Sequence, residues 1–302
     1  MATQQDNILF LEKPELRQPY LLCGINGWVD GGEAATGTVQ YLIKKLRAKK
    51  FAEMPVARYH VFQVPGQLAL RPQIKIENGL LKKHVLPQNE FFYWVNTNSD
   101  HDLILYQGTE PNTNWEEYTE NILNLARDFN VSRIYVPGGV LDKTPHTREA
   151  GVFCACSSRE LRQEMTRYAM QSSNYEGPGS FSITMLHMSQ KRKMPFVSII
   201  ARSTYYPEFN VVIPRNPKAI KAIVLRLNSL LHLNLDISDL DQEAEELEVK
   251  LNFMASHNQE FQAYIEELEK EYAEVKYEAP LDITANEAVL LAEEFLKETR
   301  DE

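Results

Sequence analysis

Short apolar segments alternate with longer segments of helical periodicity over the first 235 residues, and this alternation limits the folds open to the chain. Tyr20–Ile25 is an apolar run that predicts a strand, and apolar residues then recur at helical spacing from Glu33 to Lys49. Further strands are predicted at residues 57–64, 73–77, 91–95, 103–106, 133–136 and 196–201, and helices at 115–129, 159–170, 181–191 and 218–231. We therefore expect an α/β fold with a mixed, mostly parallel sheet flanked by helices.

The pattern changes at Ile237, where apolar residues begin to recur at alternating steps of three and four that continue to Val275. Glu fills most of the other positions, which is the pattern of a heptad repeat. One long coiled-coil helix would fit this pattern. However, Ser256 or Asn258 is well placed to cap a second helix, so we favour a hairpin of two shorter helices. A capping box at residues 284–287 predicts a last helix through Leu296.

The charge is distributed unevenly along the 302 residues, whose net charge is −10. Residues 236–302 contain 21 Asp and Glu against 5 Lys and Arg, a balance of −16, whereas the first 235 residues have a balance of +6. We predict a core domain over residues 1–235 and an acidic helical module over 236–302. The acidic balance argues against nucleic acid as a partner, because a basic face is needed to neutralise phosphates.

Neither a membrane span nor a secretion signal is expected. No stretch approaches the roughly 18–20 apolar residues of a membrane helix, and residues 1–6 lack a basic and an apolar signal region. Cys23, Cys154 and Cys156 are too few for a disulfide framework and lack the spacing of a zinc site. We expect reduced thiols and a cytoplasmic location.

The first candidate site loop joins the strand at residues 20–25 to the following helix. It contains Trp28, Asp30, Gly31 and Gly32. Glycines allow a ligand to approach the backbone closely, and the free N–H groups of a helix N-terminus attract anions, so the loop can form a pocket for a phosphate or carboxylate. Alternatively, it is a tight structural turn in which Asp30 caps the helix.

Two further loops follow predicted strands, so they are expected at the same edge of the sheet. Glu110 can act as a general base, bind a ligand hydroxyl or simply bond neighbouring backbone, and Thr113 or Asn114 can cap the next helix. The later loop runs from Val136 to Glu149 and supplies four candidates: Gly138, Gly139, His146 and Arg148. The glycines can donate to an oxyanion, the histidine can carry a proton and the arginine can bind an anion. The alternative is a rigid connection or subunit contact.

The remaining candidates are Tyr175, in a loop with Gly177 and Gly179, and Arg202, at the end of the strand at 196–201. Ser180 can cap the helix that follows this loop, and Arg202 is equally consistent with an ion pair. No nucleophile elbow, His-Glu-x-x-His motif or Cys/His pair with ligand spacing is present in the sequence. We therefore predict neither a metal nor a cofactor.

Taken in order, these loops resemble the proteasome assembly chaperone 2 family in its bacterial and archaeal branch, whose members are sometimes labelled as ATP-grasp proteins. The resemblance covers nearly the whole chain, including the acidic tail over about 236–272. It is carried by Gly27–Ala35, Gly108–Pro111 with Trp115, Gly138 and Gly139 with Pro145–Arg148, Tyr175–Pro178, and Ala201 with Arg202.

The resemblance implies a core like that of nucleoside phosphorylases and peptidase-type hydrolases, and self-assembly into rings or smaller homo-oligomers. Eukaryotic members are chaperones for proteasome subunits. Nothing in the sequence matches an ATP-grasp phosphate loop and ligand set. Archaeal relatives that engage the proteasome end in a hydrophobic residue, a tyrosine and one further residue, whereas Glu298–Glu302 ends this chain, so docking of that type is not expected.

Two functions remain open. The first is a non-catalytic, homo-oligomeric binding or assembly protein, whose partners are other copies of itself and a protein client. The second is an enzyme, a hydrolase or transferase, that acts on an anionic small molecule at a pocket built from Asp30, Glu110, His146 and Arg148. Convergence of these side chains at one end of the sheet would favour the enzyme.

Overall fold

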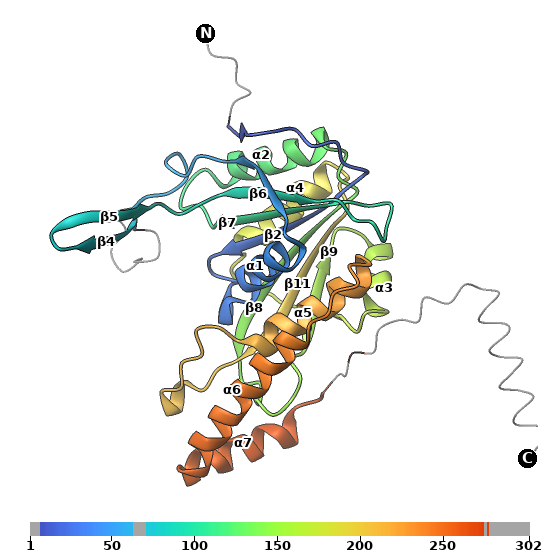
Figure 1. The fold of residues 1–302 in the computed structure, drawn as a ribbon. Helices are drawn as coiled ribbons and strands as arrows, with labels where there is room; N and C mark the ends of the chain where they lie inside the picture. Colours follow the sequence, from blue (N-terminus) through green and yellow to red (C-terminus); the bar gives the residue numbers. More distant parts are fainter. Residues whose placement is uncertain (1–6, 63–70, 275–276, 278–302) are drawn as a thin grey trace, which may run out of the picture.

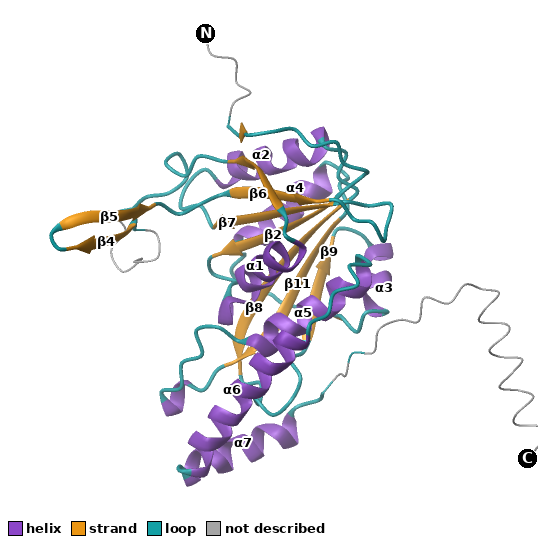
Figure 2. Cartoon of the chain, viewed as in Figure 1, coloured by secondary structure: helices purple, strands orange, loops and turns teal. Residues whose placement is uncertain are grey.

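The computed structural model describes residues 7–62, 71–274 and 277, which form a twisted sheet with helices on both faces (Figures 1 and 2). In this part of the chain the central sheet has nine strands in the order β1-β3-β6-β7-β2-β8-β11-β9-β10. They are β1 (Leu9–Phe10), β2 (Tyr20–Asn26), β3 (Lys49–Glu53), β6 (Glu90–Trp94), β7 (Leu103–Thr109), β8 (Arg133–Asp142), β9 (Val152–Cys156), β10 (Gln171–Ser172) and β11 (Phe196–Thr204).

The centre of the sheet is parallel and its flanks are mainly antiparallel. β2 pairs in parallel with β7 and β8, and β8 pairs in parallel with β11. β6, β3 and β1 are added antiparallel on one side, whereas β9 is antiparallel to β11 on the other and pairs in parallel with β10. The α/β class and the mixed sheet are therefore confirmed. Both edge strands, β1 and β10, are only two residues long.

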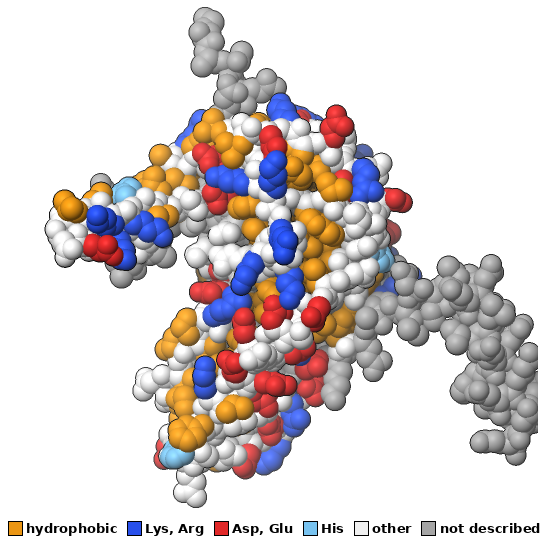
Figure 3. All heavy atoms as spheres, viewed as in Figure 1, with side chains coloured by type: hydrophobic (Ala, Val, Ile, Leu, Met, Phe, Trp, Pro, Cys, Tyr) orange, Lys and Arg blue, Asp and Glu red, His pale blue; other side chains and the backbone are white. Residues whose placement is uncertain are grey.

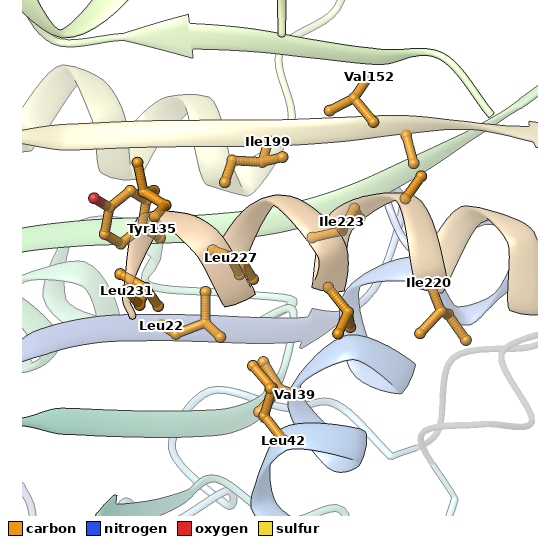
Figure 4. Close-up of a cluster of buried hydrophobic side chains, with 14 of the residues drawn as sticks. Leu22, Val39, Leu42, Tyr135, Val152, Ile199, Ile220, Ile223, Leu227 and Leu231 are labelled. Carbon is orange, nitrogen blue, oxygen red and sulfur yellow. The ribbon is translucent and has the colours of Figure 1, made fainter. Parts of the chain in front are cut away.

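Seven α-helices are described in the same residue ranges. They are α1 (Ala34–Leu46), α2 (Trp115–Asp128), α3 (Arg159–Thr166), α4 (Phe181–Lys191), α5 (Pro217–Leu230), α6 (Ser238–Ser256) and α7 (Gln259–Glu271). Alternate residues of each buried strand face opposite helical layers. Leu22 contacts the cluster of α1 and α5 (Figure 4), whereas its neighbours Leu21 and Cys23 contact the cluster of α2 and α4.

The predicted strand at residues 57–64 is wrong. Residues 57–62 form a turn in which Tyr59 and His60 are buried, and residues 63–64 lie outside the described residues. Tyr59 packs edge-on against Tyr118 with ring centroids 5.0 Å apart, and the His60 ring bonds the carbonyls of Val56 and Thr109. Tyr59 and His60 are therefore buried by the packing of a loop and not by strand pairing.

The helical break near residue 257 is confirmed. Asn258 accepts hydrogen bonds from the amides of Glu260 and Phe261, so its side chain caps α7. The first turns of α6 pack on the main core through Ile237 and Leu240. The second half of α6 and α7 pack on a smaller cluster around Tyr206. The further helix predicted from residue 284 lies outside the described residues.

Two of the described strands lie outside the central sheet. β4 (Gln73–Glu77) and β5 (Leu80–Val85) form a separate hairpin that projects away from the central sheet (Figure 1). Within the described ranges, every helix is too short or too polar to cross a membrane.

Candidate functional site

The ends of β2, β7 and β8 bring the first three candidate loops together, as the strand order requires. Asn26 pairs with Thr109 at the ends of β2 and β7, so Gly27 and Glu110 leave the sheet side by side. Asp30 in turn forms an isolated bridge with Gly139 of β8. The expected gathering at one end of the sheet therefore occurs for the loops that carry Asp30, Glu110 and Gly139.

Asp30 caps helix α1. Its Oδ1 accepts hydrogen bonds from the amides of Ala35 and Thr36 at 2.8 and 3.1 Å, and its Oδ2 accepts one from the Thr36 hydroxyl at 2.7 Å. Burial raises the pKa of Asp30 to about 6, although these three donors favour the charged carboxylate. The N-terminal amides that would bind an external anion are thus occupied by the protein's own side chain.

Gly31, Gly32 and Gly139 let the loop at residues 29–32 cross closely over β8. The Gly139 amide donates to the Val29 carbonyl at 2.8 Å, so it is not free to stabilise an oxyanion. A Cβ at Gly139 would lie 2.6 Å from the Cβ of Ala34 and closer still to the carbonyl oxygen of Gly31. Gly32 has a φ of 66°, in the left-handed region that glycine favours. These glycines are required by the chain crossing itself.

Glu110 ties two loops together through the backbone. Its Oε2 accepts from the Trp28 amide at 2.6 Å, and its Oε1 accepts from the Phe181 amide at the start of α4, at 3.3 Å. Ser180 does not cap α4, because its hydroxyl pairs with that of Ser182 at 2.8 Å. The predicted cap of α2 is also wrong: Asn114 stands at the cap position but makes no capping hydrogen bond.

His146 is not with Glu110 but lies buried against the C-terminal helices, with 1% of its surface exposed. Its Nε2 lies 3.1 Å from Oδ1 of Asn252 on α6, and its Nδ1 lies 3.0 Å from the Tyr206 hydroxyl. β8 runs on to Asp142, beyond the predicted strand end, and carries the following residues past the expected edge of the sheet. The expectation that His146 and Glu110 converge is therefore wrong.

Arg148 and Arg202 also face the C-terminal segment. Arg148 lies 3.9 Å from Glu269 of α7, and Arg202 pairs with Asp142 at 2.6 Å with its guanidinium 5.1 Å from the centre of the Tyr272 ring. The Thr147 hydroxyl also donates to Glu269. Together with the contact between His146 and Asn252, these interactions attach the segment after β8 to α6, α7 and the residues that follow.

An apolar pocket of about 320 Å³ lies beside the Glu110 contacts, between α4 and the ends of β8, β9 and β11. Trp28 and Tyr175 stand at this pocket with 67% and 70% of their surfaces exposed. Its lining includes Val140, Phe153, Ile183 and Ile200. These four residues were not predicted from the sequence, because only the pairing of Ile200 with Phe153 on neighbouring strands shows that they share a face.

A second, charged pocket of about 370 Å³ lies between α5 and α6 and includes Arg148. Its lysines are already paired, Lys218 with Glu248 and Lys221 with Asp241. Arg226 donates to the carbonyls of Tyr168, Ala169 and Ala222. In the described ranges, no three His, Cys, Asp or Glu side chains are grouped as a metal site.

The protonation of His146 should make the free energy of unfolding depend on pH. Burial lowers the pKa of His146 below its usual 6.5, so as the pH falls the unfolded chain takes up this proton before the folded chain does. We expect the contribution of His146 to be complete above pH 6.5 and to fall by up to about 1.4 kcal/mol per pH unit below it. Asp30, whose pKa rises on folding, has the opposite slope between pH 3.8 and about 6.

The measurement is therefore a comparison of the wild type with His146→Gln by denaturant unfolding between pH 8 and pH 5, so that the slope from Asp30 cancels. The stability advantage of the wild type should shrink as the pH is lowered. An advantage that does not change with pH would contradict a depressed pKa for His146.

The fold and these loops define a mixed α/β protein in which α6 and α7 pack around Tyr206 beyond the end of β11, and in which an apolar pocket opens beside α4. The sequence matches the PAC2 family over residues 24–255, and the chain belongs to this family. This confirms the resemblance to the prokaryotic proteasome assembly chaperone 2 proteins. No curated protein matches the sequence.

Solved structures show the same fold. A proteasome-assembly chaperone homologue from Mycobacterium tuberculosis is 26% identical with a TM-score of 0.71, over 82% of this chain and 99% of that one. A PAC2 family protein from Streptomyces avermitilis is 27% identical with a TM-score of 0.70, over the same shares. PbaB from Pyrococcus furiosus, an archaeal proteasome activator, is 24% identical with a TM-score of 0.63, over 82% and 97%.

Proposed function

We propose that this chain is a non-catalytic, homo-oligomeric assembly protein of the cytoplasm, which holds a protein client at the apolar pocket beside Trp28 and Tyr175. Family membership supports the class, because the similar protein from Mycobacterium tuberculosis is described as a proteasome-assembly chaperone homologue.

The proposal rests on the hydrogen-bond partners of the candidate residues. The carboxylate oxygens of Asp30 and Glu110 accept hydrogen bonds from backbone amides and from the Thr36 hydroxyl of the same chain. Apolar side chains are left to form the accessible surface of the pocket. Exposed aromatic residues around an apolar pocket are typical of protein-binding sites. The enzyme alternative requires Glu110, His146 and Arg148 in one pocket, and they lie in different places, so we prefer binding.

Native mass spectrometry of freshly purified protein tests the class of function, because it reports subunit number and bound ligand together. We expect a homo-oligomer without a stoichiometric small anion. A strictly monomeric mass at micromolar concentration would contradict self-association. An anion bound one per subunit, and lost in Arg148→Ala while the subunit number stays the same, would favour the enzyme instead.

Client binding is tested by a photo-reactive amino acid placed at Trp28, with Glu266 as the matched exposed position on α7. We expect a defined protein adduct from position 28 and none from position 266. Ile183→Asp, which puts a charge on the partly exposed wall of the pocket, should abolish the adduct without lowering the melting temperature. Equal adducts from both positions would count against the pocket.

A further inference from the structure

The β4–β5 hairpin has a well-formed turn, but both of its faces are exposed to solvent. Asn78 and Gly79 form its turn with φ values of 50° and 74°, the left-handed pair of a tight hairpin turn. Residues of both strands are exposed except for the half-buried Val85, and none belongs to the clusters of buried residues in the body. A two-stranded hairpin of this kind is at best marginally stable alone in water.

One face of the hairpin is apolar. Ile76 pairs with Leu81 across the strands, and Ile74 shares their side with His84. Ile74, Ile76 and Leu81 have exposed fractions of 58%, 60% and 62%. The opposite face carries Lys75 paired with Lys83. We call the side of Ile74, Ile76 and Leu81 the hairpin face. Its apolar area stays exposed to solvent among the residues that the structure describes.

A matching surface lies on α6. Val249 and Phe253 are 67% and 65% exposed, on the side of the helix away from the buried Leu251 and Ala255. Glu246 precedes them at helical spacing, and we call these three residues the α6 stripe. Figure 3 shows hydrophobic side chains exposed among acidic ones at this end of the molecule, and others exposed among lysines on the hairpin.

The two surfaces are both apolar, and the segments that carry them have opposite net charges. Residues 71–86, the hairpin and its flanks, contain four Lys and Arg and one Glu. Residues 238–271, which span α6 and α7, contain eleven Asp and Glu and two Lys. Opposite net charges favour encounter between two such surfaces and fix their register. In one chain the hairpin and α6 project from separate parts of the body, so they cannot meet within a single copy (Figure 1).

We propose that the hairpin face of one copy docks on the α6 stripe of a second copy. This inference rests on the proposed self-association and specifies the surfaces that carry it. Two copies can exchange this contact reciprocally as a two-fold dimer, and head-to-tail repetition around a rotation axis closes a ring. Docking also supplies the packing partner that the hairpin lacks, since its apolar face becomes buried against a helix.

Two double variants of the full chain test the docking. Ile76→Asp with Leu81→Asp spoils the hairpin face, and Val249→Asp with Phe253→Asp spoils the α6 stripe. All four side chains are exposed, so each variant should keep the wild-type circular dichroism and melting temperature of the monomer body. At a concentration where the wild type is oligomeric by native mass spectrometry, each variant alone should be monomeric.

Mixing the two variants in equal amounts gives the discriminating result. Each retains one intact surface, so a single head-to-tail contact can form and we expect a heterodimer that grows no further. Gln73→Asp places the same new side chain on the opposite side of the hairpin and should keep the wild-type oligomer.

The outcomes separate the two proposals. If both double variants keep the wild-type oligomer, the docking is wrong while self-association stands. Monomeric variants whose mixture remains monomeric would also overturn the pairing of these surfaces. A monomeric wild type would overturn self-association itself.

Discussion

Replacement of Gly139 by alanine is expected to lower the free energy of unfolding by about 3 kcal/mol, near the upper end of the range for overpacked sites. The new Cβ would lie 2.6 Å from the Cβ of Ala34 and closer to the carbonyl oxygen of Gly31. Neither neighbour is the flexible end of a side chain. Moving them would stretch the 2.8 Å hydrogen bond from the Gly139 amide to Val29 and would disturb the start of α1.

Gly179→Ala is the matched control, because a Cβ there would have no atom within 4 Å. Both variants should be compared with the wild type by equilibrium unfolding in urea. We expect the control to remain within about 0.5 kcal/mol of the wild type. Equal stability of the two variants would show that the backbone around Gly139 can move to accommodate a Cβ, and that a glycine is not needed there for packing.

The second large effect concerns the boundary between the core domain and the C-terminal module. We propose that residues 1–235 fold as a unit and that residues 236–302 are a separable module. Leu240 is fully buried in the main core, and Asp239 bonds the Tyr41 hydroxyl at 2.7 Å and Lys45 at 2.9 Å. Truncation after Leu235 removes these contacts together with the buried side chain of Ile237.

Loss of two buried aliphatic side chains is expected to cost about 5 kcal/mol, as for two large-to-small substitutions in a core. A fragment of residues 1–245 keeps both side chains and is the matched comparison. We expect both fragments to unfold cooperatively, with the shorter one about 5 kcal/mol less stable and therefore close to the limit of a folded domain. An insoluble 1–235 fragment without a cooperative transition would place the first turns of α6 within the core domain.

Much of the fold could be predicted because its signals are local. The strand at Tyr20–Asn26 and the helix at Phe181–Lys191 follow from apolar runs and helical spacing, and Asn258 marks the break between α6 and α7. The missed strand β9 has a different cause. Val152–Cys156 is too short and irregular to stand out from the loop around it, and its pairing with β11 supplies what the local pattern lacks.

The candidate site was harder to predict because it depends on where loops end in space. Asp30 and Glu110 follow β2 and β7, and Gly139 lies within the neighbouring β8, so strand order brings them together. His146 comes after β8, which continues for several residues beyond Gly139 and carries His146 to the C-terminal helices. The sequence alone gives neither the length of β8 nor the helix that His146 contacts beyond it. A histidine close to an arginine is equally consistent with a structural contact.

The shortness of β1 and β10 has a consequence for how copies of this protein can meet. An exposed edge strand offers a row of unpaired N–H and C=O groups on which another chain can continue the sheet. Leu9–Phe10 and Gln171–Ser172 are each two residues long, so neither edge of the central sheet can template an intermolecular strand of useful length. We therefore expect the central sheet to resist growth by the addition of strands. The self-association proposed above would then use side chains, which can be altered one at a time without reopening the sheet.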